Sequence, residues 1–497
     1  MRMVIFRFLR LMYPCIKFIK GCRINGRNSE SAAFYNAGNI AAQYFVNINK
    51  VHFSPVFTPE TPPAPAKQSE PYSGERIMNK IFCRLFQTAM KLGMYFLPWT
   101  TPEIIQGQGS SVEIAEDMKA RGIGRALVVM GPNMMKRGLP VPMLQRMKES
   151  GIEYSVFDSL TSDPTDIQVK AGVRAYRRLN SNTGSGQNGN PNSASNSGVA
   201  IILFGGGSPM DCGKAIAACV ARPDRTVAQL QGVLKVHSRK RVTFIYAVPT
   251  TAGTGSEATM AAVVKDQRTH RKKSINDISI IPHICVLDPS LTTGLPPEIT
   301  ANTGMDALCH AVEAYTNSTY NTAKENNMAE KAVKLIYDNL YKAFCDGSDL
   351  EARQGMQMAA FYAGRAFTRG CVGYVHALGH AIGGMYGIPH GRAMAVLLPH
   401  MMKAYGAAAE KQLARLADIC FTQEYDASGD RDKAGCFIRW MENMNKKMGI
   451  PEGFDCIEDE DIPTIAQWAE KEANPLYPVP EVFSRKELEK IIKQVCR

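Results

Sequence analysis

Short apolar segments alternate with amphipathic patterns between Ser110 and Gly294. The segments ALVVMG, EYSVFD, AIILFGGG, VTFIYAVPTT and ICVLDPS are typical of buried strands. The sequences that alternate with them, such as SVEIAEDMKARG, VPMLQRMKESG and IQVKAGVRAYRRL, repeat apolar residues at helical spacing. Strands that alternate with helices indicate βαβ units, so this region predicts a mostly parallel sheet.

The pattern changes after Leu295, where long helical segments replace the strand-like ones. Examples are NMAEKAVKLIYDNLYKAF, EARQGMQMAAFYAGRAF, AAEKQLARLADIC and KELEKIIKQV. The sequence therefore predicts a Rossmann-like α/β domain over residues 77–294, followed by an all-helical domain over residues 295–497. A ligand site is expected in the cleft between the two.

One polar insertion interrupts the predicted α/β domain. Residues 180–198, NSNTGSGQNGNPNSASNSG, contain no apolar side chain except one Ala. Such a segment cannot bury enough surface to offset the entropy of ordering, so it is predicted to be a disordered, solvated loop. It lies between a helical pattern and a strand-like run, where an insertion leaves the fold intact.

Half of the formal charge of +12 lies at the beginning of the chain. Residues 1–76 contain ten Lys or Arg and four Glu, which makes +6, and the other 421 residues share the remaining +6. So modest a surplus argues against a dedicated nucleic-acid surface. The first 50 residues are basic, amphipathic and poor in acids, as in an organelle presequence, and Ser54–Pro71 is a proline-rich tether. We expect a mitochondrial or other organelle matrix address; the alternative is an extension without an address on a cytoplasmic protein.

Membrane and disulfide signals are weak in this sequence. There is no run of 18 or more apolar residues, so stable membrane insertion is not expected. The 13 cysteines include no CxxC pair, which favours reduced thiols over a disulfide framework.

The motif ILFGGGSPMDCGKAIA places three glycines directly after a buried strand. Ser208 is predicted to cap the following helix, with Pro209 at its first position and Asp211 completing a capping box. Bare glycines at a helix N-terminus let backbone N–H groups approach a phosphate, whose charge the helix dipole favours. The motif matches neither the usual dinucleotide fingerprint nor the P-loop, so a tight turn without a ligand is the alternative.

A second glycine- and threonine-rich segment, AVPTTAGTGSEAT, follows the next apolar run. Its Thr and Gly residues offer hydroxyl and backbone donors. Two such loops at strand ends can hold the two halves of a dinucleotide, so we predict that the α/β domain binds one.

Histidines and one aspartate recur at helical spacing in the second half of the chain. Two pairs lie four residues apart, which places each pair on one helix face, and a fifth candidate follows a proline. A lone helical His is usually a core residue, but together they make a ligand set of three nitrogens and one oxygen with a spare imidazole. Fe(II) and Zn(II) both suit such a set, and either could polarise a substrate oxygen. The candidates are Asp306, His310, His376, His380 and His390.

Taken together, these motifs resemble the iron-containing (group III) alcohol dehydrogenases. The resemblance extends from about residue 77 to the C-terminus through GGGSPMDCGKA, PTTAGTGSEAT, LDPSLTTGLPPEITANTGMDALCHAVEAY, GYVHALGHAIGGMYGIPHGRAMAVLLPH and ANPLYPVP. It implies reversible hydride transfer between a primary or short-chain alcohol, or its aldehyde, and NAD or NADP. It also implies Fe(II), with Zn(II) possible, and a homodimer.

The resemblance assigns roles to the five candidates and to one aromatic residue. It implies a metal-binding catalytic domain whose ligands are Asp306, His310, His376 and His390. The second His of the VHAxxH motif, His380, would lie beside the nicotinamide and relay a proton. Phe367, nine residues before the first His of that motif, would contact nicotinamide or substrate.

Cofactor contacts transfer in the same way. The pyrophosphate would lie on Gly206, Gly207 and Ser208, and the adenosine side on Thr250, Thr251 and Thr254. Lys272, sixteen residues before Asp288, matches a lysine that reaches the cofactor ribose.

Two departures from the family pattern affect specificity. At Gly131 many NAD-dependent members have Asp, which binds the adenosine ribose and repels a 2′-phosphate. Without this carboxylate the protein could use NADP as well as NAD, and Lys136 or Arg137 could attract the 2′-phosphate. Arg369 replaces an Asn that is common in the family; it would either favour acidic substrates or pair with a nearby acid.

Other functions remain as alternatives. A hydroxyacid-oxoacid transhydrogenase would shuttle hydride between two acids on a bound cofactor. A lyase resembling dehydroquinate synthase would need phosphate-binding residues that are not apparent. A non-catalytic assembly subunit is the remote alternative, because it has no physical need for four ligand positions and two glycine loops.

Overall fold

The computed structural model describes most of the chain from Ser73 onward. The described residues are 73–161, 163–181, 198–236, 242–268, 272–317, 319–421 and 427–496. The predicted leader lies outside them except for its last four residues. The predicted loop at residues 180–198 also lies outside them, except for Gly198 and for Asn180 and Ser181, which belong to a helix (Asp166–Ser181). The address and the tether therefore stay predictions.

A parallel sheet forms the first half of the molecule, as predicted. Its strands lie in the order β1-β9-β6-β4-β2-β3, and every neighbouring pair is parallel. The strands are β1 (Glu103–Gln106), β2 (Arg125–Met130), β3 (Glu153–Phe157), β4 (Val199–Gly205), β6 (Ile245–Pro249) and β9 (Ile284–Leu287).

Helices cover both faces of this sheet, which explains why its inner strands β2, β4, β6 and β9 are almost continuously apolar. On β2, Leu127 and Val129 belong to one core while Val128 belongs to the other, since successive side chains point to opposite faces. The Leu127 face packs against α6 (Asp166–Ser181) and α7 (Gly207–Ala221). The Val128 face packs against α4 (Ile114–Ala120) and α5 (Val141–Glu149).

A small mixed sheet beside the main one has no counterpart in the sequence prediction. It consists of β5 (Gly232–Val233), β7 (Ala261–Lys265) and β8 (Lys272–Asn276), and the short helix α8 (Val227–Leu230) precedes it. The strand β8 has the sequence KKSIN, which lacks the apolar run that marks the other strands.

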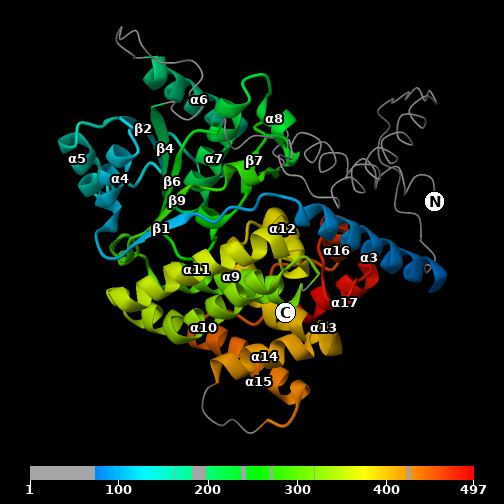
Figure 1. The fold of residues 1–497 in the computed structure, drawn as a ribbon. Coiled ribbons are helices and arrows are strands. Elements are labelled where there is room, and N and C mark those ends of the chain that lie inside the picture. The colour runs from blue at the N-terminus through cyan, green and yellow to red at the C-terminus, as the bar shows by residue number, and fades with distance from the viewer. Residues whose placement is uncertain are drawn as a thin grey trace, which may run out of the picture.

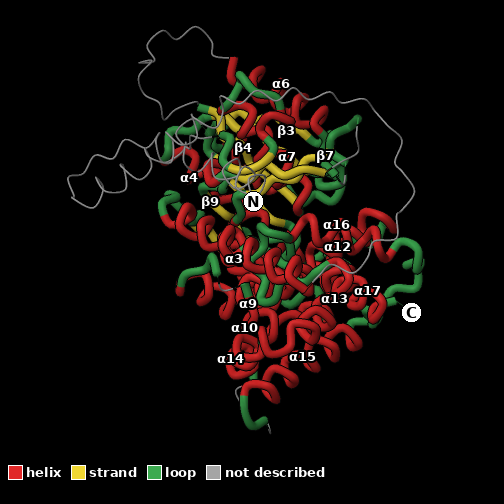
Figure 2. The backbone as a smooth tube through the Cα atoms, turned by 90° about the vertical axis from the view of Figure 1, so that its right-hand side faces the viewer, coloured by secondary structure: helices red, strands yellow, loops and turns green. Residues whose placement is uncertain are grey.

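The second half of the described chain is helical, as predicted, and encloses one large apolar core. Figure 2 shows the sheet and this helical part stacked one above the other. No described helix is both long and apolar enough to cross a membrane. The helices are α9 (Pro297–Thr316), α10 (Ala323–Cys345), α11 (Leu350–Gly370), α12 (Tyr374–Tyr386), α13 (His390–Tyr405), α14 (Glu410–Cys420), α15 (Asp430–Lys447), α16 (Ile462–Ala473) and α17 (Arg485–Val495).

The first described helix, α3 (Ser73–Tyr95), packs against the end of the chain rather than on the sheet. Figure 1 shows it beside α16 and α17. Arg84 donates hydrogen bonds to the carbonyl oxygens of Val479 and Pro480, at 2.8 and 2.7 Å. Gln87 donates to the carbonyl of Tyr477 at 2.8 Å. Residues almost 400 positions apart in sequence therefore close the helical part together.

The sheet and the helical part meet where a loop of the α/β part crosses α11. The Cα of Gly364 lies so close to Gly255 that a Cβ on Gly364 would be 2.5 Å from the Gly255 carbonyl oxygen. Gly255 has a φ of 58° and takes the left-handed conformation that favours glycine. Backbone meets backbone here, so neither side can yield to a larger residue.

Replacing Gly364 by Ala should therefore lower the midpoint of thermal unfolding. Overpacking at such a contact costs about 1–3 kcal/mol, which exceeds the gain in helix propensity. The control is Gly384→Ala on α12, where a Cβ would meet no atom within 4 Å. Gly384→Ala should leave the midpoint unchanged or raise it. Equal effects of the two variants would contradict this view of the interface.

Candidate functional site

The two predicted glycine loops lie against each other. They follow the adjacent parallel strands β4 and β6, and the Thr250 N–H donates to the Gly205 carbonyl at 3.0 Å. A Cβ on Gly206 would lie 3.3 Å from Thr251 Oγ1. One on Gly207 would lie 3.3 Å from the Thr254 methyl group. The structure thus brings together the residues that were predicted to hold pyrophosphate and adenosine.

The predicted capping box is wrong. Helix α7 begins at Gly207 with Gly206 as its N-cap, and no side chain caps it. Ser208 lies inside the first turn, and Asp211 accepts a hydrogen bond from the Ser256 hydroxyl at 3.0 Å instead. The carboxylate is thus directed at the second loop, and the N-terminus of α7 has a glycine N-cap without a side-chain cap hydrogen bond.

A buried lysine that sequence reasoning missed ties the two loops together. Lys214 has no exposed surface, and its ammonium donates to Ser256 Oγ at 2.9 Å, Thr259 Oγ1 at 3.0 Å and the Ala261 carbonyl at 2.9 Å. All three of its N–H donors are therefore used. The sequence signal was a Lys in an otherwise apolar stretch of α7.

Ionisable neighbours surround this lysine. Burial lowers the pKa of Lys214 to about 8, although the charges of Asp211 and Glu257 oppose the shift. Burial likewise raises the pKa of Asp211 to about 6 and that of Glu257 to about 7. A cation between two carboxyls lowers the cost of burying all three groups.

The predicted ligands converge on one carboxylate oxygen. Asp306 Oδ1 lies 3.3 Å from His390 Nε2, 3.9 Å from His376 Nε2 and 4.0 Å from His310 Nε2. Asp306, His376 and His390 form one of the groups whose ligand atoms are all close enough to hold a metal ion. These side chains come from three helices, α9, α12 and α13.

Close packing holds those helices together. A Cβ on Gly391, in the first turn of α13, would collide with the carbonyl of Asn302 on α9. That contact brings His390 beside Asp306. A Cβ on Gly253, in the second glycine loop, would lie 2.6 Å from Thr303 Cβ, one turn before Asp306 on α9. Helix α9 therefore connects the cluster of Asp306 and the histidines with the two glycine loops.

The chemistry of the cluster fits a divalent cation. Asp306 Oδ1, His376 Nε2 and His310 Nδ1 are buried without a hydrogen-bond partner among the described residues. Ligand atoms of a tetrahedral Zn(II) site, with bonds of about 2.0–2.1 Å, lie about 3.3–3.4 Å apart. The distances around Asp306 Oδ1 match or slightly exceed this spacing, so a small cation fits among these atoms.

The charge states of the cluster suit metal binding. Burial alone would raise the pKa of Asp306, but the histidines His310, His390 and His376 outweigh it and hold that pKa well below the usual range. Burial lowers the pKa of His310 to about 3 and that of His376 far below the ordinary value. An ionised carboxylate beside neutral imidazoles is the form in which these groups bind a cation.

His380 differs from the other histidines. Its side chain is 46% exposed, similar to the 42% of His390, but its Nδ1 lies 2.8 Å from Glu472 Oε1 on α16. Burial opposes the charged form, but Glu472 outweighs it and raises the pKa of His380. Its ring stacks on that of His390 with the centroids 5.3 Å apart. His380 thus lies at the solvent side of the cluster, and its Nδ1 contacts Glu472, which is not one of the predicted ligands. Tyr477 also donates to Glu472, at 3.0 Å.

Phe367 contacts the cluster through His310. Its ring stacks on His310 with a centroid distance of 4.2 Å and an interplanar angle of 16°. The predicted contact of Phe367 with nicotinamide or substrate remains a prediction.

A second group of potential metal ligands shares His376. Cys309, Glu313 and His376 Nδ1 also lie close enough together to hold an ion. However, Glu313 Oε2 is already 2.6 Å from His376 Nδ1, and burial raises the pKa of the Cys309 thiol well above its usual value. Burial also raises the pKa of Glu313 to about 7, while N–H groups from Gly373 and Val375 lower it. Both oxygens of Glu313 are thus engaged, whereas Asp306 Oδ1 and His376 Nε2 lack partners among the described residues, so the Asp306 group is the better site.

Two predicted cofactor residues lie in open surroundings. Gly131 follows β2, and a Cβ there would meet no atom within 4 Å. Lys136 and Arg137 in the same loop are exposed. Lys272 on β8 forms an ion pair with Asp163 at 2.6 Å, so its role at the cofactor ribose remains a prediction.

Arg369 has structural partners, as the second of its two interpretations proposed. Its guanidinium donates to the Tyr320 carbonyl at 2.9 Å, lies 4.0 Å from Glu325 and faces the Trp99 ring at 5.4 Å. The side chain is largely buried. These contacts favour a packing role over recognition of an acidic substrate.

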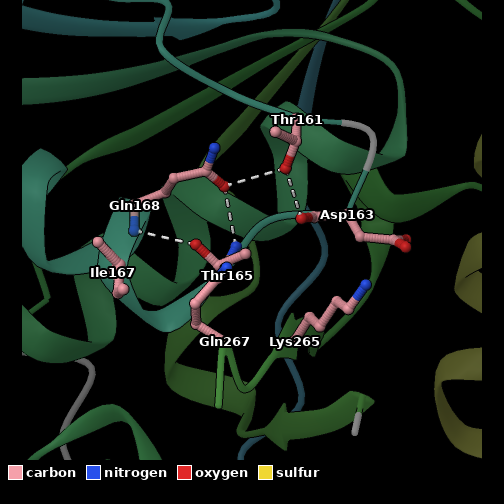
Figure 3. A pocket seen from close by; sticks show the side chains of 7 residues that line it. All are labelled: Thr161, Asp163, Thr165, Ile167, Gln168, Lys265 and Gln267. Atoms are coloured by element: carbon pink, nitrogen blue, oxygen red, sulfur yellow. Dashed lines mark hydrogen bonds between the residues drawn. The ribbon is translucent and has the colours of Figure 1, made fainter. Parts of the chain in front are cut away.

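A cavity of about 470 Å³ lies elsewhere on the α/β part, between the start of α6 and the end of β7. Figure 3 shows hydrogen bonds among its own lining residues. Thr161 donates to the Asp163 carbonyl at 2.8 Å, and the Thr165 N–H donates to Gln168 at 2.9 Å. No predicted site residue lines this cavity, and we assign it no function.

The fold and the cluster define a class of protein. A parallel sheet with paired glycine loops, joined to a helical part with a histidine–aspartate metal cluster, is the architecture of a metal-dependent, dinucleotide-linked oxidoreductase. Residues 101–184 and 188–289 match the family model of the iron-containing alcohol dehydrogenases, and residues 300–496 match its C-terminal model. The chain belongs to the iron-containing alcohol dehydrogenase family.

Individual relatives agree with this assignment. The chain is 33% identical to an NAD-dependent methanol dehydrogenase of Bacillus methanolicus, over 75% of this chain and 92% of that protein. It is 31% identical to an NADPH-dependent butanol dehydrogenase of Clostridium saccharobutylicum, over 70% of this chain and 83% of that protein. A crystal structure of 1,3-propanediol oxidoreductase superposes with a TM-score of 0.73 and 32% identity, over 80% of this chain and all of that one.

The contacts of Lys214 predict that this buried lysine stabilises the two glycine loops. Lys214→Met should cost about 3–5 kcal/mol of stability, because it leaves buried acceptors and carboxyls without their cation. The midpoint of thermal unfolding measures this loss. Lys170→Met is the control, since Lys170 pairs with Asp166 at 2.8 Å on the surface and should contribute at most about 1 kcal/mol. If both variants melt alike, Lys214 does not hold the loops together.

Proposed function

We propose that this protein catalyses the reversible oxidation of a primary or short-chain alcohol to its aldehyde with NAD or NADP. The observation that carries the proposal is the cluster around Asp306, in which Asp306 Oδ1 and His376 Nε2 are buried without a hydrogen-bond partner among the described residues. The cluster is also connected to the glycine loops through α9. Membership of the iron-containing alcohol dehydrogenase family supports the same reaction.

Four side chains would hold the metal: Asp306, His310, His376 and His390. Bound Fe(II), or Zn(II), would act as a Lewis acid on the alcohol or carbonyl oxygen and stabilise developing negative charge there. The protein's own contribution is to hold the Asp306 carboxylate close to the imidazoles of His376 and His390, with His310 Nε2 4.0 Å from Asp306 Oδ1. Two of these groups, Asp306 and His376, have side chains at most 4% exposed, so water has little access to them.

His380 is placed to exchange a proton with solvent. It is half-exposed at the edge of the cluster, and Glu472 orients its ring through Nδ1. Its Nε2 is then the atom that can take up or release the proton of the alcohol. The raised pKa of His380 keeps a proton on the ring to higher pH than in free histidine.

The paired loops would bind the cofactor. The N-terminal N–H groups of α7, beside Gly206, Gly207 and Ser208, would hold the pyrophosphate, because the N-cap Gly206 provides no side-chain cap for them. Thr250, Thr251 and Thr254 would line the adenosine side. The close approach of Gly253 to Thr303 fixes this loop relative to the metal ligands on α9, as alignment of hydride donor and acceptor requires.

No observation favours the hydroxyacid-oxoacid transhydrogenase over the alcohol dehydrogenase. The residue that might have recognised an acid, Arg369, has structural partners. An organelle address in residues 1–76 and a homodimer remain predictions alongside the proposed activity.

The decisive test pairs metal content with turnover in His376→Ala. The purified protein is assayed with NAD and NADP against a panel of short primary alcohols and aldehydes, and its metal is measured by elemental analysis. The variant should lose both metal and turnover. His400→Ala is the control, because His400 lies on α13 outside the cluster and contacts the Glu452 carbonyl at 3.1 Å; it should keep both. A metal-free His376→Ala variant that still oxidises alcohol would contradict the proposal.

Cofactor preference can be tested at Gly131. Gly131→Asp would place a carboxylate where there is room for it and repel the 2′-phosphate of NADP. We expect kcat/KM with NADP to fall by about tenfold or more, equivalent to about 1.4 kcal/mol, with a smaller change for NAD. The neutral control Gly131→Asn has the same size and should not discriminate. Equal effects of Asp and Asn would show that charge at this position does not select the cofactor.

A further inference from the structure

Glu313 lies two turns after Asp306 on α9 and uses both of its carboxylate oxygens. Its side chain is 1% exposed. Oε1 accepts a hydrogen bond from the Val375 N–H at 2.8 Å, and the Gly373 N–H also binds the carboxylate. Oε2 lies 2.6 Å from His376 Nδ1. This residue was not among the site residues predicted from the sequence.

The backbone around Glu313 is shaped to hold Oε1 in place. Gly373 is the N-cap residue of α12, and a Cβ there would lie 2.7 Å from Glu313 Oε1. The carboxylate therefore occupies the N-terminus of the helix that carries His376, where N–H groups and the helix dipole favour an anion. With Oε1 bound by the backbone, Oε2 is the oxygen left for the imidazole.

The contact with Oε2 determines which nitrogen of His376 bears the proton. In its ionised form, which the N–H groups of Gly373 and Val375 favour, the Glu313 carboxylate can only accept, so Nδ1 donates and Nε2 carries the free lone pair. Nε2 is the atom that faces Asp306, 3.9 Å from its Oδ1, and it has no partner among the described residues. The tautomer imposed by Glu313 is thus the one that can bind a cation at the Asp306 cluster.

We propose that Glu313 is a positioning residue that sets the tautomer and orientation of His376 and thereby the metal affinity of the cluster. The inference rests on the metal site of the proposed function. Carboxylates that accept from metal-bound histidines typically change metal affinity by about 10–100-fold when removed. Here the same carboxylate also caps α12, so the test must separate metal affinity from helix stability.

Glu313→Gln makes that separation. The amide oxygen can replace Oε1 at the two backbone N–H groups, which keeps the cap. The amide NH₂ then replaces Oε2 and can only donate to Nδ1, so the proton of His376 moves to Nε2 and blocks the ligand position. We expect the metal-free variant to melt close to the native protein, but to bind Co(II) about 10–100-fold more weakly. Affinity is measured by competition with a chromophoric chelator, and Co(II) absorption reports coordination.

Two further variants complete the test. Cys309→Ala removes the thiol that lies 3.7 Å from the same Nδ1, and it should keep Co(II) affinity within about threefold of native. Glu313→Ala removes the acceptor without adding a donor; we expect it to lose affinity as well, and it decides the question if the Gln variant does not fold. A Glu313→Gln protein, or in its absence a Glu313→Ala protein, with native Co(II) affinity would overturn the proposal.

The outcomes also separate this inference from the metal site itself. If native protein and His376→Ala bind Co(II) equally, the proposed metal site fails, whatever Glu313 does. If His376→Ala loses Co(II) but Glu313→Gln keeps it, only the positioning role fails.

Discussion

The buried carboxylate of Asp306 is the constraint around which the helical part is built. A charge with a 4% exposed side chain is unfavourable unless opposite charge or hydrogen bonds compensate it. Three imidazoles surround it, yet its Oδ1 has no hydrogen-bond partner among the described residues. Helices α9, α12 and α13 are held within reach of this oxygen by glycine contacts, at Gly391 and Gly373, that a larger residue would disrupt. A divalent cation bound beside Asp306 would compensate the buried negative charge of its carboxylate.

Helix α9 connects the loops proposed to bind the cofactor with the cluster proposed to bind the metal. Helix α9 carries Asp306 and His310, and its Thr303 packs against Gly253 of the second glycine loop. Farther along the same helix, Glu313 accepts a hydrogen bond from the Val375 N–H in the first turn of α12. The loop is held from the other side by Lys214 and by the contact of Gly255 with Gly364 on α11. Because these contacts are rigid and buried, a cofactor on the loops and a substrate oxygen at the cluster would meet in a fixed geometry.

Local patterns predicted much of this arrangement. The parallel sheet, the helical second half and the candidate histidines and aspartate follow from patterns a few residues long. The assignment of Asp306, His310, His376 and His390 to one metal site came from the resemblance to the family, because these residues are up to 84 positions apart. The missed features depend on distant partners. Asp211 bonds Ser256 rather than capping its helix, Glu313 meets His376 across 63 positions, and Arg84 meets Val479 across 395. Strand β8 was missed because its polar sequence carries no signal without its neighbours.

Anomalous diffraction at the absorption edge of the bound metal tests the central claim most directly. We expect one strong peak among Asp306 Oδ1, His376 Nε2, His390 Nε2 and His310, at bond lengths of about 2.0–2.2 Å as for Zn(II) with nitrogen and oxygen ligands. A peak on the other side of His376, between Nδ1, Cys309 and Glu313, would contradict it, and so would a fully loaded, active enzyme with no peak beside Asp306.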